Sequence, residues 1–291
     1  MIRFVARCIL FASIPVLAYA ESPVQKPFFS KQILLGAHRG GADEWPENTL
    51  YGFQECAKAH PGILLETDAR LTSDGAVVLL HDKTVDRTTN GTGEVATLTL
   101  EQVKALDAGH KFTADNGATF PQRSKGLTIA TLKEVLNALP DAHMLVELKG
   151  EPALADATIK IIRDAKAEDR VLFASFVPPT MDRARQLAPA MAYCFDMKNG
   201  AALLMAVRGA KWADYTPQAD VLSIDDGMIA RYNLTPEEIK TIQTKGIRIQ
   251  VHTINDPEQM KSFVAQGVDS ILTDKPTALA NVIAETKTLT K

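Results

Sequence analysis

The strongest constraint on the fold is an alternation of short apolar segments with amphipathic ones along most of the chain. Eight apolar segments of strand length are each followed by a segment with helical periodicity. This pattern is typical of parallel α/β sheets, in which each helix returns the chain to the start of the next strand. The predicted strands cover residues 33–38, 63–68, 144–148, 171–175, 191–195, 221–224, 247–253 and 270–273, and the predicted helices cover residues 50–59, 131–138, 153–165, 180–187, 201–207, 236–244, 257–266 and 277–285.

Eight such units favour a (β/α)8 TIM barrel over an open doubly wound sheet. The glycine-rich dinucleotide fingerprint of a doubly wound sheet is missing, as is a Walker-type phosphate loop. A further extended segment, 76–81, follows the second strand after a four-residue turn, which is too short for a parallel crossover, so we predict an antiparallel hairpin. Residues 84–125 then interrupt the alternation. We predict that they form a small insertion over the barrel mouth, with one helix at 100–106.

The first twenty residues have the pattern of a signal peptide. Two arginines precede an apolar run over 8–17, and residues 18–20 (Ala-Tyr-Ala) offer a cleavage site with small side chains. The run is too short to span a bilayer comfortably, so we expect no stable membrane anchor. We predict a leader segment at 21–31, the barrel domain at 32–291, and export to the periplasm or secretion.

The charge balance argues against nucleic-acid binding. The chain has 32 basic and 35 acidic side chains, a formal net charge of −3, and loss of the signal peptide would leave 30 against 35. That balance lacks the excess of Lys and Arg that holds a polyanion. The mature chain would keep Cys56 and Cys194, either as buried free thiols or as a bridge. The oligomeric state is not encoded in any pattern that we recognise.

Polar side chains are concentrated where the predicted strands end, which is where the active site of a TIM barrel lies. Glu66 and Asp68 share one face of the second strand, and Glu147 ends the third. Three converging carboxylates would repel one another, and a bound cation would relieve that repulsion. An all-oxygen set suits a hard ion such as Ca²⁺ or Mg²⁺ better than Zn²⁺. We expect one divalent cation, with Ca²⁺ favoured because an exported protein meets more of it.

Two histidines and two cationic side chains accompany these carboxylates. His38 and Arg39 end the first strand, His81 ends the hairpin, and Lys149 follows Glu147 by two residues. A metal ion with Arg39 and Lys149 would neutralise a phosphate, and the two histidines could exchange protons on its opposite sides. The set therefore predicts phosphoryl transfer.

Taken together, these segments resemble the glycerophosphodiester phosphodiesterase family. They occur in the family's order from the first strand almost to the end of the chain. The matching segments are His38-Arg39-Gly40, Pro46-Glu47-Asn48-Thr49, Glu66-Thr67-Asp68, Asp74-Gly75, His81-Asp82, Arg87-Thr88, Gly91-x-Gly93, Glu147-Leu148-Lys149, Ser175-Phe176 and the run from Gly267 to Pro276.

The resemblance implies a metal-dependent barrel enzyme that hydrolyses glycerophosphodiesters, such as glycerophosphocholine or glycerophosphoethanolamine, to sn-glycerol 3-phosphate and an alcohol. It implies that Glu66, Asp68 and Glu147 bind the metal, that His38 and His81 are the acid and base, and that Arg39 and Lys149 contact the phosphate. We also predict that Phe176 walls the glycerol end. One histidine would deprotonate the glycerol 2-hydroxyl, which attacks phosphorus, and water would then open the cyclic phosphate. One departure concerns substrate preference, because this chain has His252 where family members often carry Trp.

Several alternatives remain open at this stage. The carboxylates could form ion pairs with Arg39, Arg70 and Lys149, Phe176 could pack in the core, and His252 could face either the mouth or the core. The protein could be a phosphodiesterase for lysophospholipids or another small diester. It could also be a non-catalytic exported protein that binds glycerol phosphates, although such a protein should lack a histidine or a metal ligand.

Overall fold

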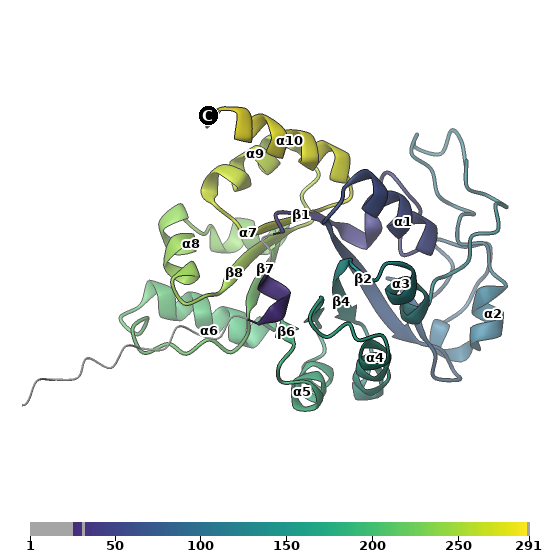
Figure 1. Cartoon of the computed structure of the whole chain (residues 1–291), viewed down its shortest axis with the longest axis horizontal. Coiled ribbons are helices and arrows are strands. Elements are labelled where there is room, and N and C mark those ends of the chain that lie inside the picture. The colour runs from purple at the N-terminus through teal and green to yellow at the C-terminus, as the bar shows by residue number, and fades with distance from the viewer. Residues whose placement is uncertain (1–25, 31–32, 290–291) are drawn as a thin grey trace, which may run out of the picture.

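The structure, a computed structural model, describes residues 26–30 and 33–289, which form the predicted (β/α)8 barrel (Figure 1). The signal-peptide prediction lies outside the described residues. The strands are β1 (Leu35–Ala37), β2 (Leu64–Leu71), β3 (Val77–Leu79), β4 (His143–Leu148), β5 (Val171–Ala174), β6 (Ala192–Tyr193), β7 (Val221–Asp225), β8 (Arg248–His252) and β9 (Ser270–Thr273).

Eight of these strands are parallel and lie in the order β6-β5-β4-β2-β1-β9-β8-β7. The ring is nearly closed between β6 and β7 by one parallel bridge, Cys194 to Val221. Two backbone hydrogen bonds support it, from Phe195 N to Val221 O at 2.8 Å and from Asp220 N to Tyr193 O at 2.9 Å. The carboxyl ends of all eight strands therefore meet at one mouth.

The helices surround the strands on the outside of the ring (Figure 1). Threonine side chains determine where several of these helices begin. Thr131 and Thr235, for example, each form a capping box with the glutamate three residues later. The α-helices are α1 (Leu50–Ala59), α2 (Leu100–Lys104), α3 (Leu132–Ala138), α4 (Pro152–Asp164), α5 (Pro178–Leu187), α6 (Met197–Arg208), α7 (Asp226–Tyr232), α8 (Pro236–Gln243), α9 (Pro257–Gln266) and α10 (Pro276–Leu289).

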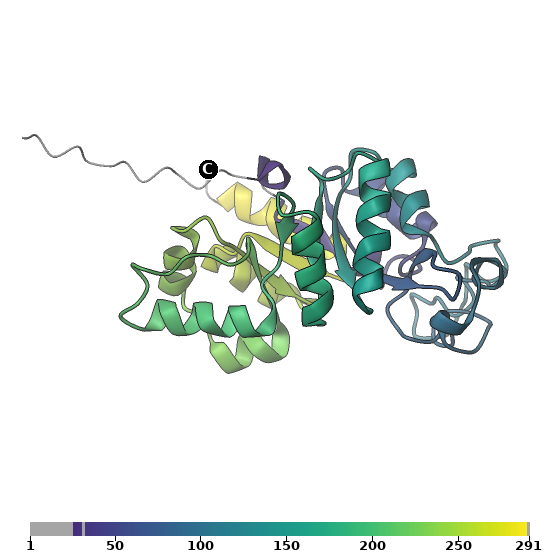
Figure 2. The same ribbon diagram turned by 90° about the horizontal axis from the view of Figure 1, so that it is seen from below.

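The predicted hairpin and insertion are both present. Strand β3 pairs with β2 in the antiparallel sense, with Arg70 opposite Val78. The segment that follows contains α2 and a 3-10 turn, η3 (Val95–Thr97), and its apolar side chains pack on β3 in a small core of their own. Figure 2 shows the insertion, in blue, at one end of the molecule, with α6 at the other.

The opposite end of the barrel is filled from the predicted leader segment. Residues Pro27–Ser30 form a 3-10 turn, η1, whose Phe28 is 6% exposed. Phe28 packs against Leu64, Leu145 and Leu172, which point into the barrel interior. The described part of the leader therefore belongs to the core, which leaves the mouth as the accessible end.

Two local predictions needed correction, and one open question was answered. Helix α6 begins four residues earlier than predicted, because the Asp196 carboxylate accepts a hydrogen bond from Asn199 N and caps it. Helix α7 was missed, since it is only seven residues long and none of its residues is fully buried. Cys56 and Cys194 are both buried free thiols. No helix within residues 26–30 and 33–289 has the length and apolar character that a bilayer crossing requires.

Candidate active site

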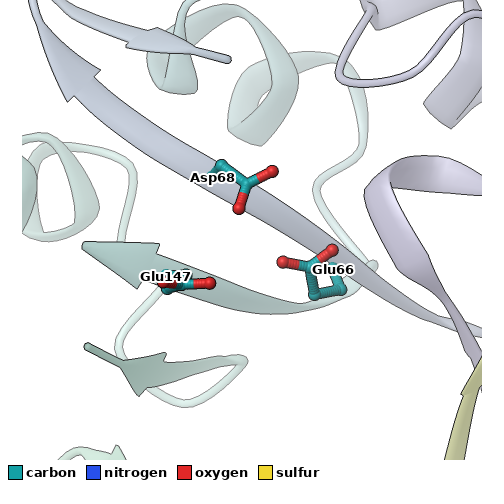
Figure 3. Close-up of side chains that lie close together, drawn as sticks. All are labelled: Glu66, Asp68 and Glu147. Carbon is teal, nitrogen blue, oxygen red and sulfur yellow. The ribbon is translucent and has the colours of Figure 1, made fainter. Parts of the chain in front are cut away.

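Three carboxylates converge at the mouth of the barrel (Figure 3). Glu66 and Asp68 project from the same face of β2, and Glu147 projects from the neighbouring strand β4, where it is the register partner of Asp68. One oxygen from each of the three lies within 4.8 Å of the others. Glu66 and Asp68 are 4% and 1% exposed, so water screens this concentration of negative charge poorly.

Two cations balance part of this charge. Lys149 Nζ lies 2.9 Å from Glu147 Oε1 and 3.4 Å from Asp68 Oδ1, and Arg39 Nε lies 3.6 Å from Asp68 Oδ2. The ion-pair alternative is therefore realised in part, for Asp68 and Glu147. Among the described residues no Lys or Arg side chain forms an ion pair with Glu66, which accepts only the backbone N–H of Arg39 at 2.7 Å. Burial, followed by the charge of Asp68, raises the pKa of Glu66 well above its ordinary value.

The donor set fits a hard divalent cation. Ca²⁺ binds oxygen ligands at about 2.3–2.6 Å, so two ligands on opposite sides of it lie about 4.6–5.2 Å apart. The carboxylate oxygens, within 4.8 Å of one another, already lie within that span. Mg²⁺, with bonds of about 2.0–2.1 Å, fits the same ligand chemistry in a tighter arrangement. A cation here would supply the positive charge that balances Glu66, which no Lys or Arg side chain provides among the described residues.

His38 is held from behind by a carboxylate from the other end of the chain. Its Nδ1 lies 2.7 Å from Asp274 Oδ1, and Asn255 Nδ2 donates to the other oxygen of Asp274 at 2.7 Å. Burial alone would raise the pKa of Asp274, but the hydrogen bonds from His38 and Asn255 lower it. Asp274 is therefore ionised and accepts from His38 Nδ1–H. That leaves His38 Nε2 as the nitrogen able to exchange a proton.

Charge also determines the pKa of His38. Burial lowers the pKa of this imidazole, but the hydrogen bond to Asp274 and the negative charge of Glu66 outweigh burial and raise the pKa above 6.5. A histidine in this state takes up a proton more readily than one in water.

His81 has the same arrangement from a different part of the chain. Its Nδ1 lies 2.7 Å from Asp82 Oδ1, and Arg87 Nε donates to Asp82 Oδ2 at 2.7 Å. The hydrogen bond from Arg87, more than that from His81, holds the pKa of Asp82 far below its ordinary value, so Asp82 accepts from His81 Nδ1–H. Arg87 also donates to both oxygens of Glu47, which in turn lies 3.3 Å from Arg39 Nη1. Each of the two histidines thus has a carboxylate behind Nδ1, which leaves Nε2 as the nitrogen able to exchange a proton.

Asn48 and Arg39 connect the segment that follows β1 to the carboxylates. Both adopt a left-handed backbone, with φ of 55° and 53°, a conformation that non-glycine residues seldom hold without support. Asn48 N donates to Arg39 O at 3.0 Å, and its side-chain amide donates to Asp68 Oδ2 at 2.9 Å. The segment Pro46–Thr49 therefore both begins α1, through Thr49, and orients Asp68.

A cavity of about 110 Å³ opens beside the carboxylates, and His38, Glu66 and Glu147 form part of its wall. Phe176 is 61% exposed and lines the same cavity, so it does not pack in the core. His252 also lines it, which answers the question of which way this residue faces. Burial, then the charge of His38, lowers the pKa of His252 to about 4, so it is neutral at physiological pH.

The hydrogen bonds around His252 determine which of its nitrogens carries the proton. Ser223 Oγ donates to Gln250 Oε1 at 2.9 Å and lies 3.0 Å from His252 Nδ1. Because the hydroxyl proton of Ser223 is already used, its oxygen accepts from His252 Nδ1–H. His252 Nε2 is therefore an acceptor in the neutral ring.

The structure brings most of the sequence-predicted site residues together and adds others. Glu66, Asp68, Glu147, Arg39 and Lys149 form one cluster, while His81 joins it through Arg70, whose guanidinium donates to the backbone oxygens of both His81 and Lys149. Sequence reasoning predicted that Asp82 orients a neighbour or fixes its loop, but it assigned no role to the other residues that orient the two histidines. The positions of Asp274 after the last strand and Asp82 after His81 were the available signals. The residues so added are Asp274, Asn255, Arg87 and Arg70.

Comparison with known proteins adds to this geometry. The sequence profile of the glycerophosphoryl diester phosphodiesterase family matches residues 38–278. The chain belongs to this family. A glycerophosphodiester phosphodiesterase from Caldanaerobacter subterraneus subsp. tengcongensis is 32% identical over 257 residues, which cover 86% of this chain and 97% of the relative. A glycerophosphodiester phosphodiesterase from Bacillus subtilis (strain 168) is 28% identical, over 91% of this chain and 90% of its own.

Solved structures of glycerophosphodiester phosphodiesterases share the barrel. The glycerophosphoryl diester phosphodiesterase domain of a Mycobacterium tuberculosis protein superposes with a TM-score of 0.74 at 19% identity, over 88% of this chain and 100% of the other. A phosphodiesterase from Oleispira antarctica, in complex with the product sn-glycerol-3-phosphate, gives 0.72 at 24% identity, over 88% and 98%. The likenesses to these structures establish the fold, and the family membership makes the protein a phosphoric diester hydrolase.

Proposed function

We propose that this glycerophosphodiester phosphodiesterase is metal-dependent and hydrolyses small glycerophosphodiesters to sn-glycerol 3-phosphate and an alcohol. Glycerophosphocholine and glycerophosphoethanolamine are the substrates that we expect. The observation that carries the proposal is the uncompensated Glu66 beside Asp68 and Glu147, at a mouth where two histidines each have a carboxylate at Nδ1 and keep Nε2 for proton exchange.

In this proposal Glu66, Asp68 and Glu147 hold one divalent cation, Ca²⁺ by preference and Mg²⁺ as the other candidate. When bound, the ion supplies positive charge for the phosphate oxygens and so stabilises the charge that grows on them. The two residues that contact the same oxygens are Arg39 and Lys149. Their present ion pairs with Asp68 and Glu147 keep both cations at the mouth.

His38 and His81 move the protons. In the first step His38 Nε2 takes the proton of the glycerol 2-hydroxyl while that oxygen bonds to phosphorus, and His81 Nε2 gives a proton to the departing alkoxide. Water then opens the cyclic phosphate, with the two roles reversed. Asp274 supports the first role because it raises the affinity of His38 for a proton. Phe176, at the edge of the cavity, walls the glycerol end.

The choice of substrate draws support from the relatives. The Oleispira antarctica phosphodiesterase was crystallised with sn-glycerol-3-phosphate as its product. The alternative of a non-catalytic binding protein requires a missing histidine or metal ligand, and both histidines and all three carboxylates are present. We therefore favour hydrolysis over simple capture.

The test uses purified protein with glycerophosphocholine, with coupled detection of glycerol 3-phosphate, before and after EDTA. We expect release that stops with EDTA and returns with Ca²⁺ or Mg²⁺. Absence of metal-dependent release from both glycerophosphocholine and glycerophosphoethanolamine would refute the proposal. Glu66→Gln should abolish both activity and tight metal binding, and a variant that stays active without metal would contradict the ligand set.

We also propose that the protein is exported after cleavage between Ala20 and Glu21. The supporting pattern is the basic start, apolar run and small-residue site in the sequence. Expression of the full chain followed by mass spectrometry of the extracytoplasmic fraction should give a polypeptide that begins at Glu21. Recovery of the uncleaved chain in the cytoplasm would disprove export.

A further inference from the structure

The cavity at the mouth is polar at one end and apolar at the other. His38, Glu66 and Glu147 form part of the polar end. The apolar end is formed by β7, α6, α7 and the segments that follow β5 and β6, mainly through the side chains of Phe176, Phe195, Leu204, Leu222 and Met228. His252 lines the same cavity, and after burial the charge of His38 is what lowers its pKa most. We therefore place His252 at the boundary between the two ends.

A chain of hydrogen bonds holds the His252 ring from behind. Gln250, which is 1% exposed, is the register partner of both Ser223 on β7 and Ser270 on β9. Its carboxamide uses both ends, since Oε1 accepts from Ser223 Oγ at 2.9 Å and Nε2 donates to Ser270 Oγ at 3.4 Å. Ser223 Oγ in turn accepts the Nδ1–H of His252 at 3.0 Å. The chain thus fixes one neutral tautomer, in which Nε2 carries a lone pair.

This lone pair on His252 Nε2 is unused. Among the described residues no side-chain or backbone group donates a hydrogen bond to it, because the ring bonds only through Nδ1. Nε2 is also not one of the unpartnered side-chain atoms that packing seals inside the described part of the chain, so it can be reached from the cavity. A ligand that donates a hydrogen bond here gains a partner, and one without a donor leaves a largely buried acceptor unpaired.

We propose that His252 Nε2 accepts a hydrogen bond from the terminal (sn-1) hydroxyl of the glycerol group, and that this contact makes His252 a specificity-determining residue. The inference rests on the proposed function, in which phosphorus lies between His38 and His81 and His38 takes the proton of the 2-hydroxyl. Carbon 1 is attached to carbon 2, so its hydroxyl extends past His38 and away from phosphorus.

The strand order puts His252 on the glycerol side of the phosphate. Strand β3, which precedes His81, pairs with β2, and β2 neighbours β1, which precedes His38. Only β9 separates β1 from β8, which ends at His252. His38 therefore lies between the other two histidines along the mouth.

The chemistry of the substrate identifies the donor. The choline group of glycerophosphocholine has no N–H or O–H, so the two glycerol hydroxyls are the only donors that this substrate offers. The 2-hydroxyl is committed to His38 in the proposed first step. The terminal hydroxyl takes no part in bond making or breaking, and it remains free to donate to His252 throughout both steps.

The test compares kcat/KM for glycerophosphocholine and for 2-hydroxypropyl phosphocholine of the same configuration, with enzyme supplied with Ca²⁺ or Mg²⁺. The second substrate keeps the 2-hydroxyl that attacks phosphorus and lacks only the terminal hydroxyl. We expect the wild-type enzyme to prefer glycerophosphocholine by about 10- to 100-fold, because the other substrate leaves the acceptor unpaired. If glycerophosphocholine is hydrolysed but the ratio is near one, this inference is wrong. If neither diester is hydrolysed, the proposed function fails and the inference fails with it.

Variants at position 252 separate a contact with substrate from a structural role. His252→Phe keeps a ring but removes the acceptor, so it should lower kcat/KM for glycerophosphocholine and bring the ratio close to one. His252→Gln, whose carboxamide oxygen can accept, should keep part of the wild-type ratio. His252→Leu replaces His252→Phe should the latter not fold, as judged by circular dichroism.

The matched control is His60→Phe, the same chemical change outside the cavity. His60 does not line the cavity, and its Nε2 lies 3.2 Å from Thr277 Oγ1. This variant should keep the wild-type ratio. An equal loss of kcat/KM on both substrates in His252→Phe would overturn the proposal, since it would mean that His252 supports the fold of the mouth and does not bind the hydroxyl.

Discussion

The two halves of the barrel mouth differ in chemistry and in construction. On one side the ends of β1, β2, β4 and β9 present a dense network of carboxylates, cations and histidines joined by hydrogen bonds and ion pairs. On the other side β7, α6 and α7, with the segment between β6 and α6, present apolar side chains that border an open cavity. The first half contains the groups that could perform hydrolysis, and the second contains surface that could select among substrates.

The packing of the two halves differs in the same way. Strands β2 and β4 share six register pairs, which fix Asp68 against Glu147. Strand β6 is only two residues long and meets β7 through a single bridge, and α7 buries none of its residues fully. Positioning of reacting groups requires a rigid frame, while a selective wall tolerates changes in side-chain shape. The comparison therefore predicts large effects of substitution on the charged half and smaller, substrate-specific effects on the apolar half.

The largest effect should come from the histidines of the charged half. His38→Ala and His81→Ala each remove a group that exchanges a proton with the substrate, and we expect kcat/KM to fall by about 10²–10⁴-fold for every diester. Steady-state kinetics with circular dichroism as a check on folding would measure this. Rates within a few-fold of the wild type would contradict the assignment of proton transfer to the charged half of the mouth.

The next effect tests whether water is excluded from His252, which lies at the boundary between the charged and apolar halves. His252 is neutral in the folded protein because its pKa is about 4, whereas in the unfolded chain it takes up a proton near pH 6.5. The unfolded state thus binds more protons between about pH 6.5 and 4, so the stability contributed by the neutral ring is complete above pH 6.5 and is lost as the pH falls through that window.

His252→Gln removes this titration, so the variant should lose less stability on acidification than the wild type. Between pH 7 and 5 the difference should be on the order of 2 kcal/mol in the free energy of unfolding. Urea denaturation of both proteins at the two pH values, in the same EDTA concentration, would measure it. Equal losses in the two proteins would mean that His252 is solvated, and that the apolar half begins further from Glu66.

A smaller effect is expected for the residue that positions His38. Asp274→Asn should lower kcat/KM about tenfold, because the neutral amide no longer holds the Nδ1–H tautomer as firmly. Since Asp274 raises the pKa of His38, its loss should move the acidic limb of the pH profile to lower pH. Asp256→Asn, at the cap of α9, serves as the control. A fall in rate with an unmoved acidic limb would assign Asp274 a purely structural role.

The sequence predicted much of the fold because local physics determines it. Apolar runs of strand length, amphipathic helices and short connections specify parallel β/α units almost without reference to one another. The hairpin after β2 was predictable from the length of its turn. Helix α7 was not, because seven residues make less than two full helical turns and give only a weak periodic signal. The small core that the insertion forms with β3 depends on tertiary packing, which no local pattern records.

The features of the site likewise divide into those that the sequence predicted and those that only the tertiary structure decided. A barrel must gather the ends of its strands at one mouth. The sequence alone predicts which side chains lie at those ends, namely Glu66, Asp68, Glu147, His38 and His81. Which groups then touch was decided only by the tertiary structure. His38 meets Asp274 across 236 residues, and Lys149 pairs with two carboxylates and leaves Glu66 without a cation. The apolar end of the cavity is assembled from β7, α6, α7 and the segments that follow β5 and β6. Residue type and periodicity are local properties, whereas burial, charge balance and cavity shape exist only once distant segments are packed together.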